Sequence, residues 1–278
     1  MSIGYFNGQF IDLNKAVLPI EERGHHFGDG VYELIRCYNG KPFMLKEHIE
    51  RLFNSAKEIK LKIGQTKKEI EQLIFEGIEI SGLLNSDVYL QITRGIAERN
   101  HLFPNVPVSI SMTVKPWKEM DASLREKGIK TIFHPDERWA NCYIKSLNLL
   151  PNILAKQTAY EKGCFEAILI RDGYITEGTS SNVFIVKNGK LYTTPLSNQI
   201  LPGITRMAVK KYAEQLQISL HEEHFAPEEL LDADEVFITS TTAEILPVVE
   251  CEGKRIGNGK PGDITKALYE EFQRFIEL

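Results

Sequence analysis

Apolar residues between positions 45 and 80 recur at the spacing of amphipathic helices. The pattern predicts one helix over 45–61 and a second over about 67–80. The apolar stripe of the first consists of Ile49, Leu52, Phe53, Ala56 and Ile59, and that of the second of Ile70, Leu73, Ile74 and Ile78. Arg51 points away from the centre of the first stripe.

Strand patterns flank this helical region. Residues 1–43 are predicted to form short strands, because the Asn-Gly pairs at 7–8 and 39–40 are typical hairpin turns. Val88, Leu90 and Ile92 alternate with polar residues, and 108–114 alternates in the same way. Together these elements predict a first α+β unit.

The second half of the chain mixes strands and helices more evenly. The polar, proline-bearing stretch 115–128 is predicted to be a linker. Strands are then predicted at about 129–134, 142–147, 166–171, 182–187, 190–193, 234–239 and around 245–256, and helices at 151–162, about 203–217 and from 262 onward. We therefore expect a mixed α/β protein of two domains, 1–118 and 119–278.

Composition narrows the class of protein. A chain of 278 residues with 42% hydrophobic and 26% charged residues is typical of a globular protein. The net charge of −5 and pI near 5.9 argue against a nucleic-acid partner. No signal peptide or long apolar run is present, so we expect a cytoplasmic protein without a membrane partner. The ligands are expected to be small molecules.

Metal and disulfide chemistry are not indicated. The four cysteines are scattered and form no CxxC pair. His221 and His224 have a ligand-like spacing, but no third ligand is near them in the sequence, and metal sites need three or four. We expect no metal site.

Lys145 stands at the centre of the apolar stretch Cys-Tyr-Ile-Lys-Ser-Leu-Asn, residues 142–148. Withdrawal from water favours the neutral amine, which is a nucleophile able to form a Schiff base with a carbonyl. The alternative is a lysine at a strand edge that reaches solvent.

Two further stretches are suited to phosphate. Leu201-Pro-Gly-Ile-Thr-Arg206 opens a helix at Gly203, whose first-turn N–H groups and Thr205 hydroxyl could bind an anion. Ser240-Thr-Thr242 offers hydroxyls and amides after an apolar strand. An ordinary Pro-Gly turn and a serine-threonine turn are the alternatives.

Glu177 lies among small hydroxyl residues in Thr176-Glu-Gly-Thr-Ser-Ser-Asn182. Such a carboxylate could hold a ring nitrogen protonated, although it could equally be a loop glutamate. A Schiff-base lysine, a carboxylate for a ring nitrogen and two phosphate sites are together what pyridoxal 5′-phosphate requires.

The motifs, taken in order, resemble those of the fold-type IV (class IV) pyridoxal-phosphate enzymes, which include branched-chain and D-amino-acid aminotransferases and aminodeoxychorismate lyase. The matching stretches are Phe27-Gly-Asp-Gly-Val-Tyr-Glu33, His48-Ile-Glu-Arg51, Lys145-Ser-Leu-Asn148, Glu177-Gly-Thr-Ser-Ser-Asn182, Gly203-Ile-Thr-Arg206 and Ser240-Thr-Thr242. The resemblance implies a small N-terminal α/β domain, a larger C-terminal pseudo-barrel domain, and a homodimer.

The resemblance also assigns roles to individual residues. Lys145 would be the Schiff-base lysine and Glu177 the partner of the pyridine nitrogen. The residues that would hold the phosphate are Arg51, Ile204, Thr205 and Thr241.

Thr93-Arg-Gly-Ile-Ala-Glu-Arg-Asn-His101 distinguishes the members of this family. If the segment is extended, Arg99 and His101 share one side, where they could bind a carboxylate. Without the resemblance, a polar surface loop would be the preferred interpretation.

With the resemblance, Tyr32, Arg99 and His101 match the carboxylate-binding trio of D-amino-acid aminotransferases, in which the arginine and histidine come from the neighbouring subunit. The implied function is transfer of the amino group of D-alanine or another D-amino acid to 2-oxoglutarate or pyruvate. A branched-chain or (R)-amine aminotransferase and the lyase are the alternatives. His25 and His26 depart from the pattern of well-known D-specific relatives, so they leave substrate breadth open.

Overall fold

The computed structural model describes residues 1–277, and their contacts divide the chain into two compact units. The first unit contains Met1–Lys118 together with Ile144–Asn148. The second contains Glu119–Tyr143 and the described chain from Leu149 onward. The segment around Lys145 therefore packs with the N-terminal unit, although it follows the first part of the second unit in sequence.

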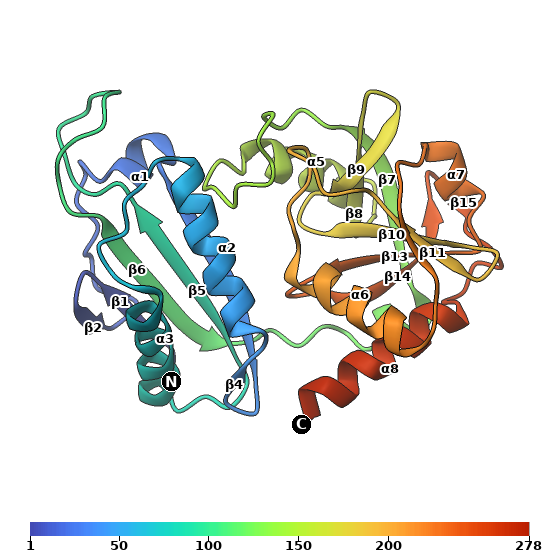
Figure 1. Ribbon diagram of the computed structural model, residues 1–278, viewed down its shortest axis with the longest axis horizontal. Helices are drawn as coiled ribbons and strands as arrows, with labels where there is room; N and C mark the ends of the chain where they lie inside the picture. Colours follow the sequence, from blue (N-terminus) through green and yellow to red (C-terminus); the bar gives the residue numbers. More distant parts are fainter. Residues whose placement is uncertain (278) are drawn as a thin grey trace. The chain divides into compact units, whose positions relative to one another are not determined.

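An antiparallel sheet forms the centre of the first unit (Figure 1). In spatial order its strands are β2 (Gln9–Ile11), β1 (Ile3–Phe6), β6 (Ser109–Pro116), β5 (Ser86–Thr93), β3 (Gly30–Tyr38) and β4 (Lys41–Pro42). Val88, Leu90 and Ile92 of β5 are completely buried, as their alternation predicted. The predicted turns at Asn7-Gly8 and Asn39-Gly40 are confirmed by positive φ at all four residues.

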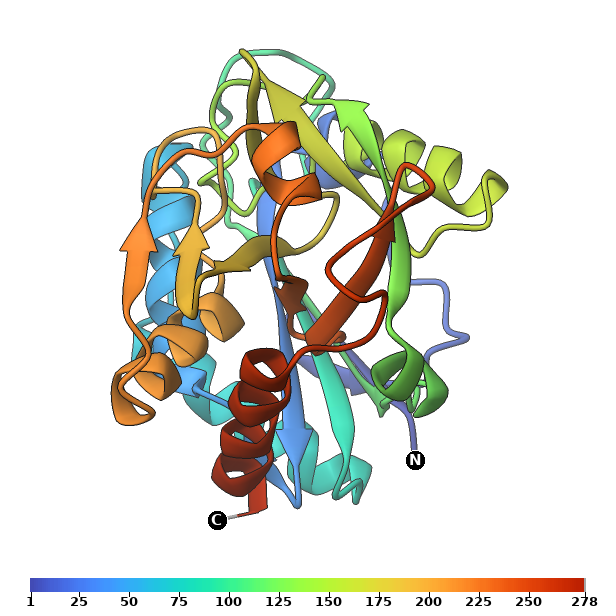
Figure 2. The ribbon, with the colours of Figure 1, turned by 90° about the vertical axis from the view of Figure 1, so that its right-hand side faces the viewer.

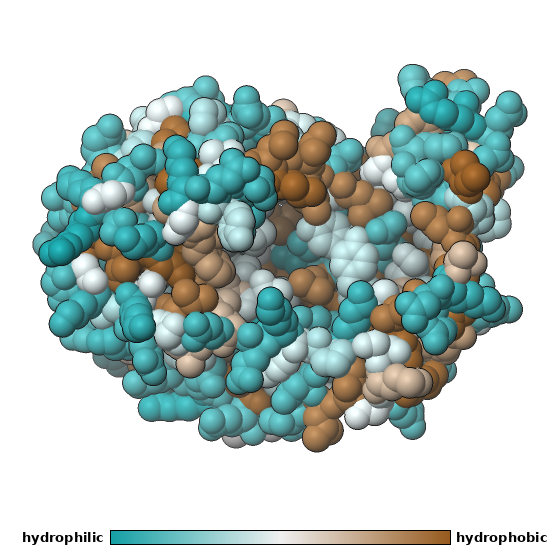
Figure 3. All heavy atoms as spheres, turned by 180° about the vertical axis from the view of Figure 1, so that it is seen from behind, coloured by the Kyte–Doolittle hydropathy of each residue, from teal (hydrophilic) through white to brown (hydrophobic). Residues whose placement is uncertain are grey.

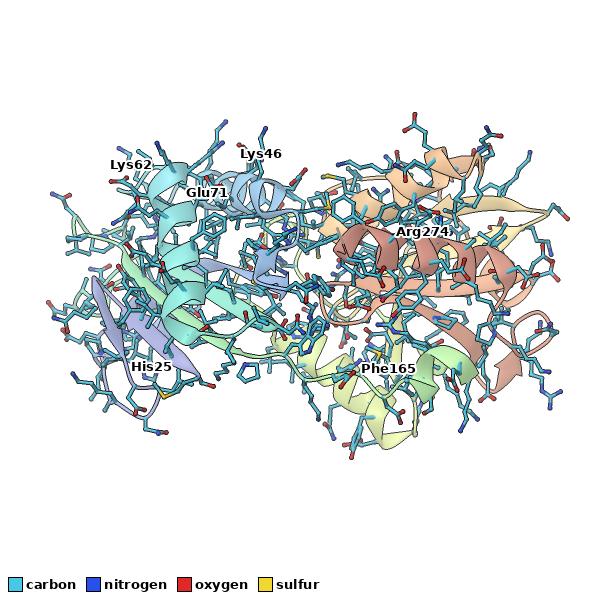
Figure 4. The ribbon with its side chains drawn as sticks, turned by 90° about the horizontal axis from the view of Figure 1, so that it is seen from below. His25, Lys46, Lys62, Glu71, Phe165 and Arg274 are labelled. Carbon is cyan, nitrogen blue, oxygen red and sulfur yellow. The ribbon has the colours of Figure 1, made fainter. Side chains whose placement is uncertain are left out.

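Helices α2 (Leu45–Glu58) and α3 (Lys67–Ser81) pack against this sheet. The centres of the two predicted apolar stripes are buried, whereas Phe53, Ile59 and Leu73 at their margins are half-buried. A capping box between Thr66 and Glu69 begins α3. Lys46 and Lys62 point away from the unit in Figure 4. A short helix, α1 (Arg23–Phe27), precedes β3 and ends at Gly28 in the left-handed region.

A mixed sheet organises the second unit and is curled rather than flat (Figure 2). Its strands are, in spatial order, β12 (Leu220–Glu222), β11 (Lys190–Thr193), β10 (Asn182–Lys187), β13 (Glu235–Ser240), β14 (Glu244–Cys251), β7 (Ile129–Pro135), β8 (Glu166–Arg171) and β9 (Tyr174–Gly178), with β15 (Lys254–Arg255) paired to β14. Strand β9 also approaches β10, which accounts for the curl. Phe184 of β10 and Phe237 of β13 stack with ring centroids 4.9 Å apart in the core.

Helices of the second unit cover this sheet. They are α4 (Ser123–Lys127), α5 (Leu150–Glu161), α6 (Ile204–Gln215), α7 (Pro227–Leu231) and α8 (Asp263–Glu277). Helix α5 contacts β7 and β8, whereas α6 and α8 contact each other and β13. The helices predicted at 151–162, 203–217 and from 262 are confirmed, with ends that differ by one to two residues.

The strand predicted at 142–147 is wrong. The segment is irregular and makes one isolated bridge, from Ser146 to Val31 of β3. Its hydrogen-bonding groups are used locally: the Tyr32 N–H donates to the Lys145 carbonyl at 3.0 Å, and the Leu147 N–H donates to the Gly30 carbonyl at 3.1 Å. Cys142 and Ile144 are buried and Tyr143 and Leu147 are half-buried, but contact with one short stretch of β3 is too brief to form a strand.

The molecular surface carries a mixture of side chains. On the face drawn in Figure 3, apolar positions are scattered among polar ones. Among residues 1–277, no helix has the length and hydropathy needed to cross a membrane.

Candidate active site

Lys145 is placed against strand β3 and helix α2. Its backbone N–H donates to Ser55 Oγ at 3.1 Å, and its Nζ lies 4.2 Å from the centre of the Tyr32 ring. Ser55 follows Arg51 by one helical turn, so both residues lie on the same face of α2. The first unit thus brings together three of the predicted site residues, Lys145, Tyr32 and Arg51.

Arg51 belongs to a buried ionic cluster. Its Nε and Nη2 atoms each donate at 2.7 Å to the Glu33 carboxylate, and His48 Nδ1 lies 2.7 Å from Glu33 Oε2. Burial alone would raise the pKa of Glu33, but Arg51 and His48 lower it to about 2. Burial lowers the pKa of His48, with Glu33 acting in the opposite direction. Glu33 therefore fixes the orientation of the guanidinium that is predicted to hold phosphate.

Glu177 lies in the second unit, at the end of β9, and is 4% exposed. Arg138 Nη1 donates to its Oε1 atom, while Asn182 Nδ2 and the Leu201 N–H each donate to Oε2 at 3.0 Å. Burial raises the pKa of Glu177 to about 7, although Arg138 and Leu201 act in the opposite direction. The carboxyl group is held firmly and is well suited to share a proton with a ring nitrogen.

Arg138 is itself fixed by a second carboxylate. Its Nε and Nη2 atoms donate to Asp136 at 2.8 Å each, and Arg171 Nη2 lies 3.0 Å from Asp136. Arg138 and Asp136 carry no recognisable signal in the sequence, because Asp136-Glu-Arg-Trp139 looks like an ordinary polar loop. Glu33 is the last residue of the Phe27–Glu33 motif, and its pairing with Arg51 depends on the packing of β3 on α2.

Within the second unit, Ile204 and Thr205, which are predicted to bind phosphate, lie close to the Glu177 network. Gly203 is the N-cap of α6 and supplies no side-chain acceptor, so the N–H groups of the first turn at Ile204 and Thr205 point out of the helix. Asn182 donates to the Leu201 carbonyl as well as to Glu177. An uncapped helix start beside an oriented carboxyl group suits a phosphate-bearing, ring-nitrogen cofactor.

Thr241 follows β13 in the turn to β14. Strand pairing places Thr239 opposite Asn182, so the turn that carries Thr241 lies at the same end of the sheet as Asn182. Ser240 Oγ accepts a hydrogen bond from the Ala243 N–H at 3.0 Å, which shapes this turn.

Arg99 and His101 form a separate exposed group in the first unit. The segment is a bent loop rather than extended, yet both side chains contact one ring. Arg99 Cζ lies 4.9 Å from the Phe27 centroid, and the His101 ring meets Phe27 edge-on at 5.6 Å. Tyr32 contacts a different set, Tyr89 and Lys145.

The remaining histidines singled out in the sequence have aromatic neighbours. His221 stacks on Tyr192 and His224 lies near Tyr174. Within residues 1–277, no group of three or more potential metal ligands is found. His25 lies at the surface of the first unit (Figure 4).

Comparisons with known proteins agree with this arrangement. Residues 30–251 match the family described as Amino-transferase class IV. The chain is 44% identical to the D-alanine aminotransferase of Staphylococcus haemolyticus, covering 98% of this chain and 97% of that protein. It is 45% identical to the D-alanine aminotransferase of Bacillus licheniformis, covering 98% and 96%.

Solved structures also resemble the fold. The branched-chain amino acid aminotransferase of Escherichia coli gives a TM-score of 0.92 at 30% identity, covering 99% of this chain and 94% of that one. The T.th. branched-chain amino acid aminotransferase with pyridoxamine 5′-phosphate gives 0.92 at 29% identity, covering 99% and 93%.

The chain belongs to the class IV aminotransferase family. The predicted fold type is confirmed, and so is the prediction of a pyridoxal-phosphate-dependent aminotransferase. The residues described above fit this cofactor, since they supply an amine, a buried carboxyl group and an open helix start.

Proposed function

We propose that this aminotransferase moves the amino group of D-alanine or another D-amino acid to 2-oxoglutarate or pyruvate. The observation that carries the proposal is the joint placement of Arg99 and His101 on Phe27, since a guanidinium beside an imidazole suits a substrate carboxylate. The D-alanine aminotransferases named above support it by identity along the whole chain.

The roles of the site residues follow from their chemistry. When bound, pyridoxal phosphate stabilises negative charge that develops at the substrate Cα. Lys145 Nζ takes the Cα proton and later returns it, acting as general base and then as general acid. Glu177 keeps the proton on the ring nitrogen through a charge-assisted hydrogen bond, while Arg138 and Asn182 keep Glu177 in place.

Phosphate binding is assigned to charges and backbone amides. Arg51 would supply the positive charge, with its orientation fixed by Glu33. Ile204 and Thr205 would supply first-turn N–H groups, and Thr241 a hydroxyl. Together these contacts would anchor the cofactor while its other end reacts.

Substrate handedness would follow from where the carboxylate binds. Lys145 delivers the proton from a fixed side, so the end of the site that holds the carboxylate decides which enantiomer is used. Tyr32, Arg99 and His101 would hold that carboxylate, with Arg99 and His101 coming from the neighbouring subunit of a homodimer. We further infer a cytoplasmic location, in keeping with the unpaired Cys37, Cys142, Cys164 and Cys251.

The reaction is tested with purified enzyme and four amino donors: D-alanine, D-glutamate, L-leucine and (R)-1-phenylethylamine, each with 2-oxoglutarate and with pyruvate. We expect ping-pong kinetics and the highest kcat/KM with the D-amino acids. Preference for L-leucine would favour the branched-chain alternative, although the solved structures of that class are less similar in sequence, at 29–30% identity, than the D-alanine aminotransferases at 44–45%. Preference for the amine would point to an (R)-amine aminotransferase.

The role of Lys145 is tested by Lys145→Ala. The variant should lose the visible absorbance of lysine-bound cofactor and retain less than about one thousandth of the wild-type kcat, because both the nucleophile and the proton carrier are gone. Lys156→Ala, on helix α5, is the control and should keep both properties. Retention of the absorbance by Lys145→Ala would disprove the assignment.

A further inference from the structure

The loop of residues 95–107 carries Arg99 and His101, and both are exposed. Fixing an exposed, flexible side chain on binding costs about 0.5–1.5 kcal/mol of entropy, so a substrate-binding pair benefits from being held in advance. The described contacts supply two such supports, Phe27 and Arg23, both from helix α1.

Phe27 is the first support. Its ring lies 4.9 Å from Arg99 Cζ and 5.6 Å from the His101 ring, so one aromatic surface contacts both members of the pair. Contact between a guanidinium and an aromatic face is attractive because of the ring quadrupole. The ring therefore restricts Arg99 and His101 relative to each other.

Arg23 is the second support, and it acts on the backbone. Its Nη1 donates at 2.5 Å to the carbonyl of Asn100, the residue between Arg99 and His101. Its Nε donates to Asp29 at 2.9 Å, and its Cζ lies 4.9 Å from the Phe27 ring. Arg23 is only 3% exposed, so this buried guanidinium ties the middle of the loop to the ring beneath its side chains.

The base of the loop is also closed. The Arg23 N–H donates to the Gly95 carbonyl at 3.0 Å, and a Cβ at Gly95 would lie 2.1 Å from the Pro107 carbonyl oxygen. Arg94 Cζ lies 3.7 Å from the Phe103 ring, which holds the far side of the loop. The loop is thus fastened at its base, its middle and its far side.

We propose that Phe27 and Arg23 are positioning residues that hold Arg99 and His101 ready for the substrate carboxylate. The proposal rests on the proposed function and deepens it. Neither residue touches the reacting atoms; each acts through the Arg99–His101 pair. Loss of either support should raise KM for the carboxylate-bearing donor and leave kcat nearly unchanged.

The test compares Phe27→Leu with Phe27→Tyr in the holoenzyme. Phe27→Leu removes the aromatic face, so we expect faster hydrogen–deuterium exchange in peptides spanning 95–107 and a KM for D-alanine raised about three- to ten-fold, with kcat within about two-fold of wild type. Phe27→Tyr keeps the ring and should behave like wild type. Phe75→Leu, on the exposed side of α3, is the control for loss of a phenylalanine elsewhere.

Arg23→Lys is the second variant, and it tests the positioning role independently if Phe27→Leu does not fold. Lysine keeps the charge beside Asp29 but cannot span Asp29 and the Asn100 carbonyl as the guanidinium fork does. We expect the same increase in exchange and in KM. Propionate, which has the carboxylate and lacks the amine, should inhibit both variants more weakly by a similar factor.

Unchanged exchange in the 95–107 peptides of both variants would overturn the proposal. So would faster exchange with an unchanged KM, provided that Arg99→Ala does raise KM. If Arg99→Ala also leaves KM unchanged, the carboxylate site itself is wrong and both proposals fail together. Absence of any activity of the wild type on D-alanine would contradict the proposed function, while exchange would still decide whether Phe27 and Arg23 hold the loop.

Discussion

Glu33 supports the candidate active site although no chemical step of the proposed reaction is assigned to it. Its side chain is completely buried and takes both arms of the Arg51 guanidinium. A buried carboxylate is tolerated only when its charge is matched, and here Arg51 and His48 match it. Removing its charge would take away the carboxylate that accepts hydrogen bonds from Arg51 Nε and Nη2.

The low pKa of Glu33 gives a pH prediction. The folded-state pKa is about 2, below the ordinary 4.5, so its stabilisation is full above pH 4.5 and is lost as pH falls toward 2. Between pH 6 and pH 3 the wild type should lose about 2 kcal/mol from this group, a loss that Glu33→Gln lacks. Urea unfolding at both pH values measures the difference.

Glu71→Gln, at a half-buried position of helix α3 (labelled in Figure 4), is the control and should follow the wild-type profile. Parallel loss of stability in wild type and Glu33→Gln would contradict the prediction.

At the scale of elements, the start of helix α6 requires glycine at position 203, because there is no room for a side chain. A Cβ at Gly203 would lie 2.0 Å from Asn182 Oδ1. Asn182 cannot move aside freely, because it is 4% exposed and donates to both Glu177 and the Leu201 carbonyl. The start of α6, the Asn182 amide and the Glu177 carboxyl group are therefore packed tightly, so a change in one displaces the others.

Gly203→Ala should accordingly destabilise the protein by about 1–3 kcal/mol, the usual range for overpacking. It should also weaken cofactor retention, because Asn182 must leave Glu177. Urea unfolding and the absorbance of the dialysed protein measure these effects. Gly64→Ala, where a Cβ meets nothing within 4 Å, should not destabilise. Equal stability of the two variants would refute this account.

Local pattern predicted most elements, since their apolar periodicity is strong and the Asn-Gly pairs at 7–8 and 39–40 mark turns. It failed at 142–147, where apolar residues are buried without extended pairing. It also missed Arg138, whose partners Asp136 and Glu177 are brought together only by the sheet. The apolar pattern predicts which residues are buried. It does not predict which residues distant in sequence become hydrogen-bond or ion-pair partners, because that depends on the folded structure.

At the scale of the whole molecule, the proposed homodimer predicts how two inactive variants should complement each other. If Arg99 and His101 act in the neighbouring subunit, a hybrid dimer of one Lys145→Ala subunit and one Arg99→Ala subunit brings the two defects into the same site. One site then carries both defects and the other carries none. The hybrid should recover about half of the wild-type activity per dimer, as two-fold symmetry requires.

Hybrids are obtained by co-expressing the two variants with different affinity tags and purifying through both. Sedimentation should give about twice the chain mass of 31.7 kDa. Hybrids no more active than the parent variants would place Arg99 in its own subunit's site.

The excursion of Ile144–Asn148 into the first unit constrains how the gene could be divided. The chain leaves the first unit at Lys118, returns for five residues and leaves again. A split enzyme cut after Lys118 would separate β3 from the lysine-bearing segment that bridges to Val31. A chimaera that exchanges one unit with a relative would therefore have to keep Ile144–Asn148 with the N-terminal unit. A single crossover point cannot do this, because the segment lies within the sequence of the second unit.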